Sequence, residues 1–288
     1  RHPVDASLAA RAQVWTPGSL MAQVDENLAK WSSEWDWSTR GDEWSTWWGD
    51  TPALWAGALL PRIHAYVPAG MILEIAPGYG RWTQYLKDLG DRLAIVDLTE
   101  RCIDGCRNRF ADSDHIEYHV NDGRSLSMIE DGSIDFTFSF DSLVHVEADV
   151  LQDYLHELRR TLKSDGVGFI HHSNIGSYPR LTALARRVPS RATGPLIRRG
   201  AVINAKAWRA ESVTAELFAS MCEAAGLVCI TQEKVNWEFG RYLIDAFSTF
   251  TPVGSRWARP CRTWCNPLFT DEARRMRRLY AGPSFVSA

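Results

Sequence analysis

The sequence has no long apolar run and no large excess of charge of either sign. Its 288 residues carry 32 Lys and Arg against 35 Asp and Glu, a formal net charge of −3, which gives no reason to expect a nucleic-acid partner. No stretch approaches the roughly 18 apolar residues of a membrane-spanning helix. The first residues lack the charged-then-apolar pattern of a secretion signal. We therefore expect a cytoplasmic enzyme with no membrane span.

Metal-binding patterns are also missing. Cys102 and Cys106 lie four residues apart, as do Cys261 and Cys265, whereas a zinc site needs tighter pairs or regularly spaced histidines. We expect ordinary reduced thiols. Tryptophan, in contrast, is abundant: seven of the 13 tryptophans fall between Trp31 and Trp55.

Strand and helix patterns alternate through the middle of the chain. Short apolar runs predict strands at 71–76, 92–98, 116–120, 133–141 and 166–173, and helical spacing predicts helices at 81–90, 99–110 and 150–163. Such alternation favours an α/β fold with a Rossmann-like, doubly wound, mostly parallel sheet. After a helix at 212–227, the runs 228–237 and 242–252 predict an antiparallel hairpin at the sheet edge. The expected sheet has seven strands.

Three regions flank or interrupt this pattern. Residues 1–69 are predicted to form a Trp-rich N-terminal helical cap. Within it, Thr51 followed by Pro52 is typical of a helix N-terminus and predicts a helix that continues to about Val67. The predicted catalytic domain spans 70–251 and contains an insert at 176–210, after the fifth strand. Residues 252–288 form a C-terminal extension, which packs either on the core or on a partner.

Polar residues and glycines follow three successive predicted strands. The segment from Glu74 to Gly80 lies between a strand and a helix, where glycines let the backbone approach a nucleotide. Asp97 ends the second strand, where a carboxylate can accept hydrogen bonds from ribose hydroxyls. Residues 121–123, Asn-Asp-Gly, follow the third strand and suit an adenine contact. Each feature alone also fits a helix cap or a tight turn. A dinucleotide oxidoreductase is disfavoured, because residues 78–83 lack the last glycine of G-x-G-x-x-G.

Residues 73–86, 94–99, 121–123 and 136–146 together resemble the successive motifs of class I S-adenosylmethionine-dependent methyltransferases. The resemblance covers about residues 70–175, and 210–251 in outline. It implies S-adenosyl-L-methionine as cofactor, with Glu74, Ala76, Gly78 and Gly80 at its methionine part, Asp97 at the ribose, and Asp122 with Gly123 at the adenine. The same site is expected to include Tyr79, Trp82, Leu98, Asn121 and Phe140. One departure is visible: the first glycine of the family loop is Ala76 here.

Methyl transfer to a hydroxyl needs a base, and the strand ends offer three histidines together with Asp141. His145 lies where the family often carries a histidine near the donor methyl, and an imidazole can take a proton from an alcohol; the alternative is a histidine that packs the crevice floor. Asp141 orients or shares that role. His171 and His172 alternate along a strand, so one of them is expected to reach the substrate. Asp141, Ser173 and Asn174 include possible Mg²⁺ ligands, although we expect no metal.

The acceptor is expected to contact the cap and the insert. Trp47, Trp48 and Trp55 are candidates for a stacking platform, with hydrophobic bulk as the alternative. The insert contains no acidic residue and eight cations, of which Arg198 and Arg199 are candidates for anion recognition; a solvated face is the alternative. His172 and Asn174 complete the predicted acceptor site.

As a whole, residues 138–146 with 169–174 are similar to bacterial sugar and polysaccharide O-methyltransferases. This similarity implies O-methylation of a saccharide hydroxyl in a polysaccharide, a glycolipid or a sugar-containing metabolite. The alternatives are a natural-product O- or N-methyltransferase and a non-catalytic cofactor-binding scaffold. A homo-oligomer is compatible with the sequence.

Overall fold

The computed structural model describes residues 24–204, 208–237 and 241–280, without the side chains of Ser190, Arg191, Arg198, Leu279 and Tyr280. Its centre is one sheet with strand order β3-β2-β1-β4-β5-β7-β6-β8. The strands are β1 (Ala69–Ile75), β2 (Gly90–Asp97), β3 (Ile116–Val120), β4 (Ile134–Ser139), β5 (Leu162–Ser173), β6 (Leu227–Val235), β7 (Asp245–Pro252) and β8 (Arg262–Asn266). All neighbours pair in parallel except β5 with β7 and β6 with β7. The predicted α/β class and mostly parallel sheet are confirmed.

The predicted count of seven strands is wrong, because β8 adds an eighth strand beside β6. Its sequence, Arg-Thr-Trp-Cys-Asn, is mostly exposed and carries no apolar alternation that would indicate a strand. The antiparallel pair β6 and β7 exists, but β7 lies between β5 and β6 and β8 covers the outer side of β6. The predicted hairpin is therefore inside the sheet and not at its edge.

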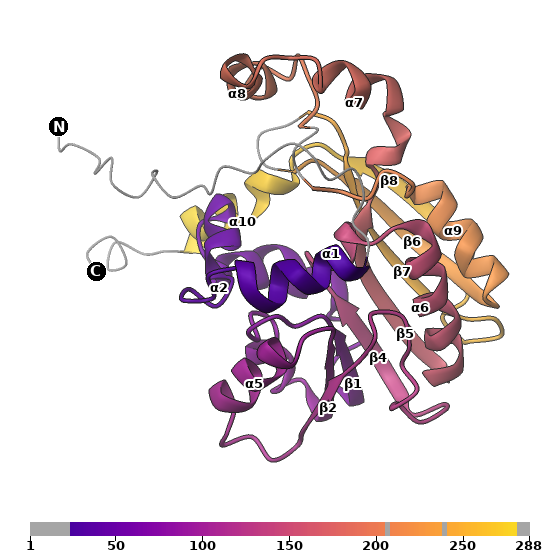
Figure 1. Ribbon diagram of the computed structural model, residues 1–288. Coiled ribbons are helices and arrows are strands. Elements are labelled where there is room, and N and C mark those ends of the chain that lie inside the picture. The colour runs from indigo at the N-terminus through magenta and orange to yellow at the C-terminus, as the bar shows by residue number, and fades with distance from the viewer. Residues whose placement is uncertain (1–23, 205–207, 238–240, 281–288) are drawn as a thin grey trace.

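Helices cover both faces of the sheet (Figure 1). On one side lie α6 (Ala148–Thr161) and α9 (Ala215–Ala224), which bury residues such as Leu151, Leu155 and Phe218. On the other side lie α4 (Thr83–Leu86), α5 (Glu100–Arg109) and α10 (Phe269–Tyr280) together with the N-terminal segment. Neighbouring residues of β1 serve opposite cores, Ile72 on the cap side and Leu73 on the α6 side. The sheet is thus doubly wound, as the sequence predicts.

The N-terminal segment consists of short helical pieces: α1 (Val24–Ala29), the π-helical turn η1 (Lys30–Glu34) and the 3₁₀ helix η2 (Asp42–Trp48). The single helix predicted to reach Val67 is divided into α2 (Thr51–Leu54), the π-helical turn η3 (Trp55–Leu59) and α3 (Leu60–Ile63). Asp50 caps it by accepting a hydrogen bond from the Ala53 backbone at 2.7 Å. The interruption coincides with Pro61, which has no backbone N–H to continue the helical ladder.

The remaining elements are η4 (Leu143–His145), which follows β4, and the pieces of the insert, η5 (Ile175–Ser177), α7 (Pro179–Ala185) and α8 (Ser190–Arg198). The predicted extension packs on the core: Phe269 of α10 is fully buried against Trp48 of η2. Within the described part of the chain, no helix has the length and apolar character needed to cross a membrane.

Candidate active site

A pocket lies at the carboxyl ends of β1, β2 and β4, beneath the segment that runs from α1 to η2. The space between its lining atoms is about 870 Å³, including the part open to solvent. Its sheet-side wall is formed by residues that follow these strands, and its outer wall by residues 24–44. The lining residues used below are Trp31, Trp37, Arg40, Trp44, Ala76, Gly78, Arg81, Trp82, Asp97, Leu98, Gly123, Phe140, Asp141 and Ser142.

The loop after β1 contributes one side of the pocket and uses its two glycines differently. Ala76 and Gly78 line the pocket, each with φ +57°. Gly80 (φ +79°) does not line the pocket and instead faces α5. A Cβ at this position would lie 2.4 Å from the ring of Phe110 at the end of that helix. Gly80 therefore allows the loop to pack on the helix, and the predicted cofactor contact falls on Gly78.

The left-handed backbone at Ala76 predicts that Ala76→Gly stabilises the protein. An L-residue with a Cβ is strained at this φ, and glycine is not. We expect the free energy of unfolding to rise by about 1 kcal/mol, measured by denaturant titration. Ala94→Gly, in the buried centre of β2, is the control and should lower the stability. A destabilised Ala76→Gly would contradict the strain argument.

Asp97 presents a carboxylate at the pocket edge. Its Oδ1 accepts hydrogen bonds from the backbone N–H and the hydroxyl of Thr99 at 2.9 and 3.1 Å, and its Oδ2 accepts from the Gly78 N–H at 3.2 Å. A carboxylate has about four acceptor positions, so Oδ2 keeps room for one further donor, such as a ribose hydroxyl. Burial raises the pKa of Asp97 to about 6 despite these hydrogen bonds.

At the end of β3, the pocket contact comes from Gly123 and from Leu98 after β2. Asp122 does not line the pocket: its carboxylate is exposed and accepts hydrogen bonds from the backbone of Arg124 and Ser125. Asn121 donates to the Tyr154 hydroxyl at 3.0 Å and accepts from the Gly123 N–H. Asp122 and Asn121 thus hold the turn that places Gly123, and the adenine contact of the Asp122 side chain stays a prediction.

Two other predicted cofactor residues lie behind the pocket wall. Glu74 is buried and accepts a hydrogen bond from the Thr83 hydroxyl at 2.6 Å, and burial raises its pKa to about 8. Tyr79 stacks on Trp37, with ring centroids 4.7 Å apart. Trp82 does line the pocket, and its buried indole N–H donates to no acceptor among the described residues, so it is a candidate contact for a bound ligand.

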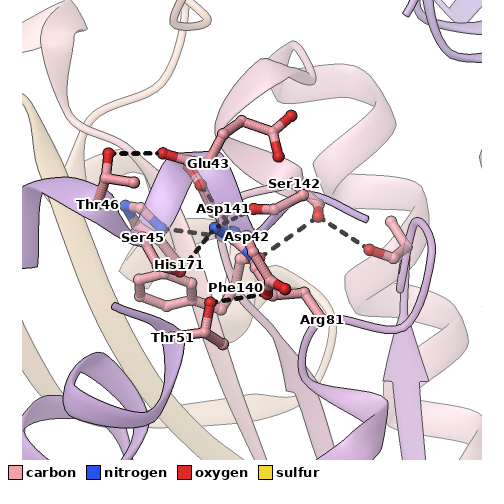
Figure 2. A network of polar contacts seen from close by, with 12 residues as sticks. Asp42, Glu43, Ser45, Thr46, Thr51, Arg81, Phe140, Asp141, Ser142 and His171 are labelled. Carbon is pink, nitrogen blue, oxygen red and sulfur yellow. Dashed lines mark hydrogen bonds and ion pairs between the residues drawn. The ribbon is translucent and has the colours of Figure 1, made fainter. Parts of the chain in front are cut away.

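Phe140, Asp141 and Ser142 form the floor where β4 ends. Asp141 has φ +62°, and its carboxylate pairs with Arg81 at 2.9 Å between Nη2 and Oδ2. Ser142 donates to the Ala76 carbonyl at 2.9 Å, which joins the floor to the cofactor loop. Figure 2 shows Asp141 in a polar network with Arg81, Ser142 and His171. Asp141 is therefore the predicted catalytic residue that the fold places inside the pocket.

None of the three predicted histidines lines the pocket. His145 is buried beneath Trp31 and stacks on Trp208 with centroids 4.3 Å apart, and burial lowers its pKa to about 4. His171 lies under the floor, where its Nδ1 accepts a hydrogen bond from the Asp141 N–H at 3.1 Å. His172 is on the opposite face, stacked on Phe218. The predicted acceptor contact of His172 is wrong, because its side chain is fully buried on that far face.

The tryptophans of the cap divide into two groups. Trp31, Trp37 and Trp44 line the pocket and contact one another, with centroids 5.7 to 5.9 Å apart. Trp47 is 40% exposed and does not line the pocket. Trp48 and Trp55 belong to the core, where Trp48 packs on Trp237 and Phe269 and Trp55 stacks on Tyr85. The predicted platform of Trp47, Trp48 and Trp55 is thus corrected, since the cap turns a different set of indoles toward the pocket.

The rest of the predicted acceptor site does not reach the pocket. Asn174 is buried and its amide contacts the Leu243 carbonyl, the Ala215 N–H and Ser177, so its predicted acceptor contact is wrong. Arg199 is exposed at the end of α8 and does not line the pocket, while the side chain of Arg198 lies outside the described residues.

The sequence analysis did not single out Arg209, which is buried beneath the site. Arg209 forms an ion pair with Asp245, with 2.8 Å between Nε and Oδ1. Across the described ranges, no group of three His, Cys, Asp or Glu side chains is arranged to hold a metal ion. The Mg²⁺ set that the sequence suggested is not assembled, because the Ser173 hydroxyl donates to the Ala210 carbonyl and Asn174 is held as described above.

Comparisons with known proteins can now be set beside this geometry. Residues 72–166 match the family model described as a methyltransferase domain. No protein in the curated set matches significantly. Among solved structures, the PH0226 protein from Pyrococcus horikoshii OT3 is similar at 21% identity and a TM-score of 0.51, over 79% of this chain and 97% of that one. The complex of DhpI with SAM and HEP is similar at 19% identity and a TM-score of 0.51, over 82% of this chain and 100% of that one.

The structural likenesses, at these identities, establish the fold, which is the Rossmann-like fold of class I methyltransferases. The family match assigns the strands that build the pocket to a methyltransferase domain. The chain therefore contains a methyltransferase domain at residues 72–166, for which the sequence predicts S-adenosyl-L-methionine as cofactor. The lining of the pocket also suits this cofactor. A buried carboxylate with an open acceptor position, a glycine-containing loop and a tryptophan with an unpartnered indole N–H all border one cavity.

Proposed function

We propose that the protein transfers the methyl group to a hydroxyl of a saccharide, and that Asp141 is the base. The observation that carries this proposal is the position of the Asp141 carboxylate, on the pocket floor next to the loop that holds Ala76 and Gly78. When bound, S-adenosyl-L-methionine supplies a methyl group on a positively charged sulfur, which departs as a neutral thioether. Asp97, Gly78, Leu98 and Gly123 would hold it.

The chemistry required of the chain is positioning and proton removal. The bound cofactor would supply the methyl group to the acceptor oxygen and would keep the electron pair of its carbon–sulfur bond. The hydroxyl proton passes to a carboxylate oxygen of Asp141. His145 is a weaker candidate for this step, because it does not line the pocket and Trp31 and Trp208 cover its ring.

The outer wall supports a saccharide acceptor. Trp31, Trp37 and Trp44 offer indole faces, which pack on the C–H faces of sugars. Arg40 and Arg81 add donors for hydroxyl or acidic groups on the same wall. A phenol of a natural product is the second candidate, because a wall of three indoles suits a planar aromatic ring equally well.

An acceptor panel with labelled methyl donor separates the two candidates. We expect transfer to oligosaccharides or sugar-containing metabolites and a methyl ether as the product. Transfer to phenols or amines, with none to any glycan, would remove the saccharide proposal and leave the methyltransferase assignment intact.

Trp31→Ala is expected to weaken acceptor binding without changing cofactor binding. Loss of one aromatic face should raise the KM for the acceptor roughly 2- to 10-fold, while the Kd for the demethylated cofactor stays constant in calorimetry. Trp264→Ala is the matched control, because Trp264 is 45% exposed on β8 and does not line the pocket. An unchanged acceptor KM in Trp31→Ala would contradict the proposed wall.

A further inference from the structure

Three ionisable side chains from distant parts of the sequence lie beneath the pocket floor. Arg209 ends the insert, His171 lies in β5 and Asp245 begins β7. The side chains of His171 and Asp245 are fully buried, and that of Arg209 is 4% exposed. None of the three lines the pocket. Charged groups persist in such surroundings only when they are paired, so their partners show what the group does.

Asp245 binds Arg209 with both oxygens: Nε lies 2.8 Å from Oδ1 and Nη2 lies 3.1 Å from Oδ2. The guanidinium also packs over the ring of Trp237, 4.8 Å from its centroid. A two-point contact fixes the orientation of a guanidinium. In this orientation, Nη2 of Arg209 stays 3.8 Å from Oδ1 of Asp141, which is longer than the 2.9 Å contact between Asp141 and Arg81.

Asp245 also reaches Asp141 by a second route, through His171. The Nδ1 atom of His171 accepts the backbone N–H of Asp141 at 3.1 Å, and its Nε2 lies 3.3 Å from Oδ2 of Asp245, an electrostatic contact without hydrogen-bond geometry. Because Nδ1 is an acceptor, a neutral ring carries its proton on Nε2, facing Asp245. The carboxylate thus favours the tautomer that holds Asp141, whose backbone has φ +62°.

We propose that Asp245 is a positioning residue for methyl transfer. It holds Arg209 at a distance from Asp141 and maintains the His171 tautomer that binds the Asp141 backbone, so that the Asp141 carboxylate faces the pocket with Oδ2 on Arg81 and Oδ1 clear of Arg209 to accept a proton. This inference rests on the proposed role of Asp141 as the base.

The charges around Asp141 indicate what happens when Asp245 is neutralised. Burial by itself would raise the pKa of Asp245, but Arg209 and His171 lower it to about 2, so it is ionised at neutral pH. The groups that face Asp141 are Arg81, Arg209 and His171, with His145 nearby. Without the charge on Asp245, Arg209 loses its two-point carboxylate contact, and its Nη2 lies 3.8 Å from Oδ1 of Asp141. A stronger interaction with a cation favours the ionised form of Asp141 and makes it a weaker base.

Asp245→Asn tests the inference by the pH dependence of kcat at saturating cofactor and acceptor. We expect kcat to fall about 10- to 100-fold, and the acid limb of the kcat profile to move to lower pH. The Kd for the demethylated cofactor should stay within about twofold, because Asp245 does not line the pocket. Glu233→Gln is the matched control: Glu233 is buried and binds Arg62 with both oxygens, at 2.7 and 2.6 Å, outside the pocket. It is expected to lower stability and to leave the profile unmoved.

A second readout does not depend on turnover. With ¹⁵N-labelled histidine, assigned by comparison with His171→Gln, the wild-type ring should show Nε2 protonated and Nδ1 bare, and Asp245→Asn should show a mixture of tautomers. The inference would be overturned if Asp245→Asn had the same pH profile of kcat and the same ¹⁵N chemical shifts of His171 as the wild-type protein. If Asp245→Asn does not fold, Arg209→Lys replaces it, and full kcat in that variant overturns the inference instead. Failure of the base assignment is distinguishable, since it appears as retained turnover in Asp141→Asn.

Discussion

Asp141→Asn is expected to lower kcat by about 10²- to 10⁴-fold, the range typical of losing a general base. The amide cannot accept the hydroxyl proton, so the acceptor must lose it to water as the new bond forms. Asn tolerates positive φ better than most residues, and Asp141 has φ +62°, so the floor should keep its backbone. The Kd for the demethylated cofactor should change little.

The measurement is kcat under saturating conditions, with calorimetry for the cofactor. Asp149→Asn is the control, because Asp149 pairs with Arg124 at the surface and lies outside the pocket. It should retain full turnover. If Asp141→Asn retains kcat within about tenfold while the control behaves as stated, Asp141 is not the base.

Asp97→Asn is expected to weaken cofactor binding by about 10²-fold. A hydrogen bond to a charged group contributes about 1.5–3 kcal/mol, and the amide also contacts the Gly78 N–H less favourably than the carboxylate does. The kcat at saturating cofactor should be affected much less than the Kd, because Asp97 is not placed on the reacting hydroxyl.

The Kd for the demethylated cofactor should also depend on pH, because protonation of Asp97 removes the acceptor. The ionised form of Asp97 is the acceptor, and its pKa is about 6. Above pH 6 the Kd for the demethylated cofactor should be constant; below it, the Kd should rise towards tenfold per pH unit as the carboxyl becomes protonated. In Asp97→Asn this dependence should disappear. A wild-type Kd that stays constant down to pH 5 would contradict the assignment.

Local sequence patterns were sufficient for much of the fold and for part of the site. Apolar runs buried on both faces predict β1, β2 and β4, and the residues that follow such strands reach a common edge, where Ala76, Gly78, Asp97 and Asp141 line one pocket. The strand β8 was missed because pairing with β6, and not side-chain burial, defines it.

Other parts of the site depend on contacts that no local pattern encodes. Trp47 and Trp48 are no less aromatic than Trp31 and Trp44, and only the folding of the cap decides which indoles face the pocket. The pair of Arg209 and Asp245 joins the insert to β7, so neither residue carries a signal on its own. His171 and His172 were separated correctly by strand alternation, yet alternation does not reveal that the pocket floor covers His171.

The last described helix, α10, packs on the segment at residues 50–57 that follows η2, and this has a practical meaning. Met276 and Ala273 of α10 touch Gly57, and Arg277 pairs with Asp50 at 3.6 Å, so the last helix props the segment that carries the cap. We therefore expect substitutions in α10 to change the acceptor preference, because they would shift the segment that follows the pocket-lining tryptophans. Substitutions in α10 are therefore a way to change the position of the pocket-lining tryptophans without altering the strands that bind the methyl donor. The kinetics of a fusion protein joined after α10 should be compared with those of the unfused protein.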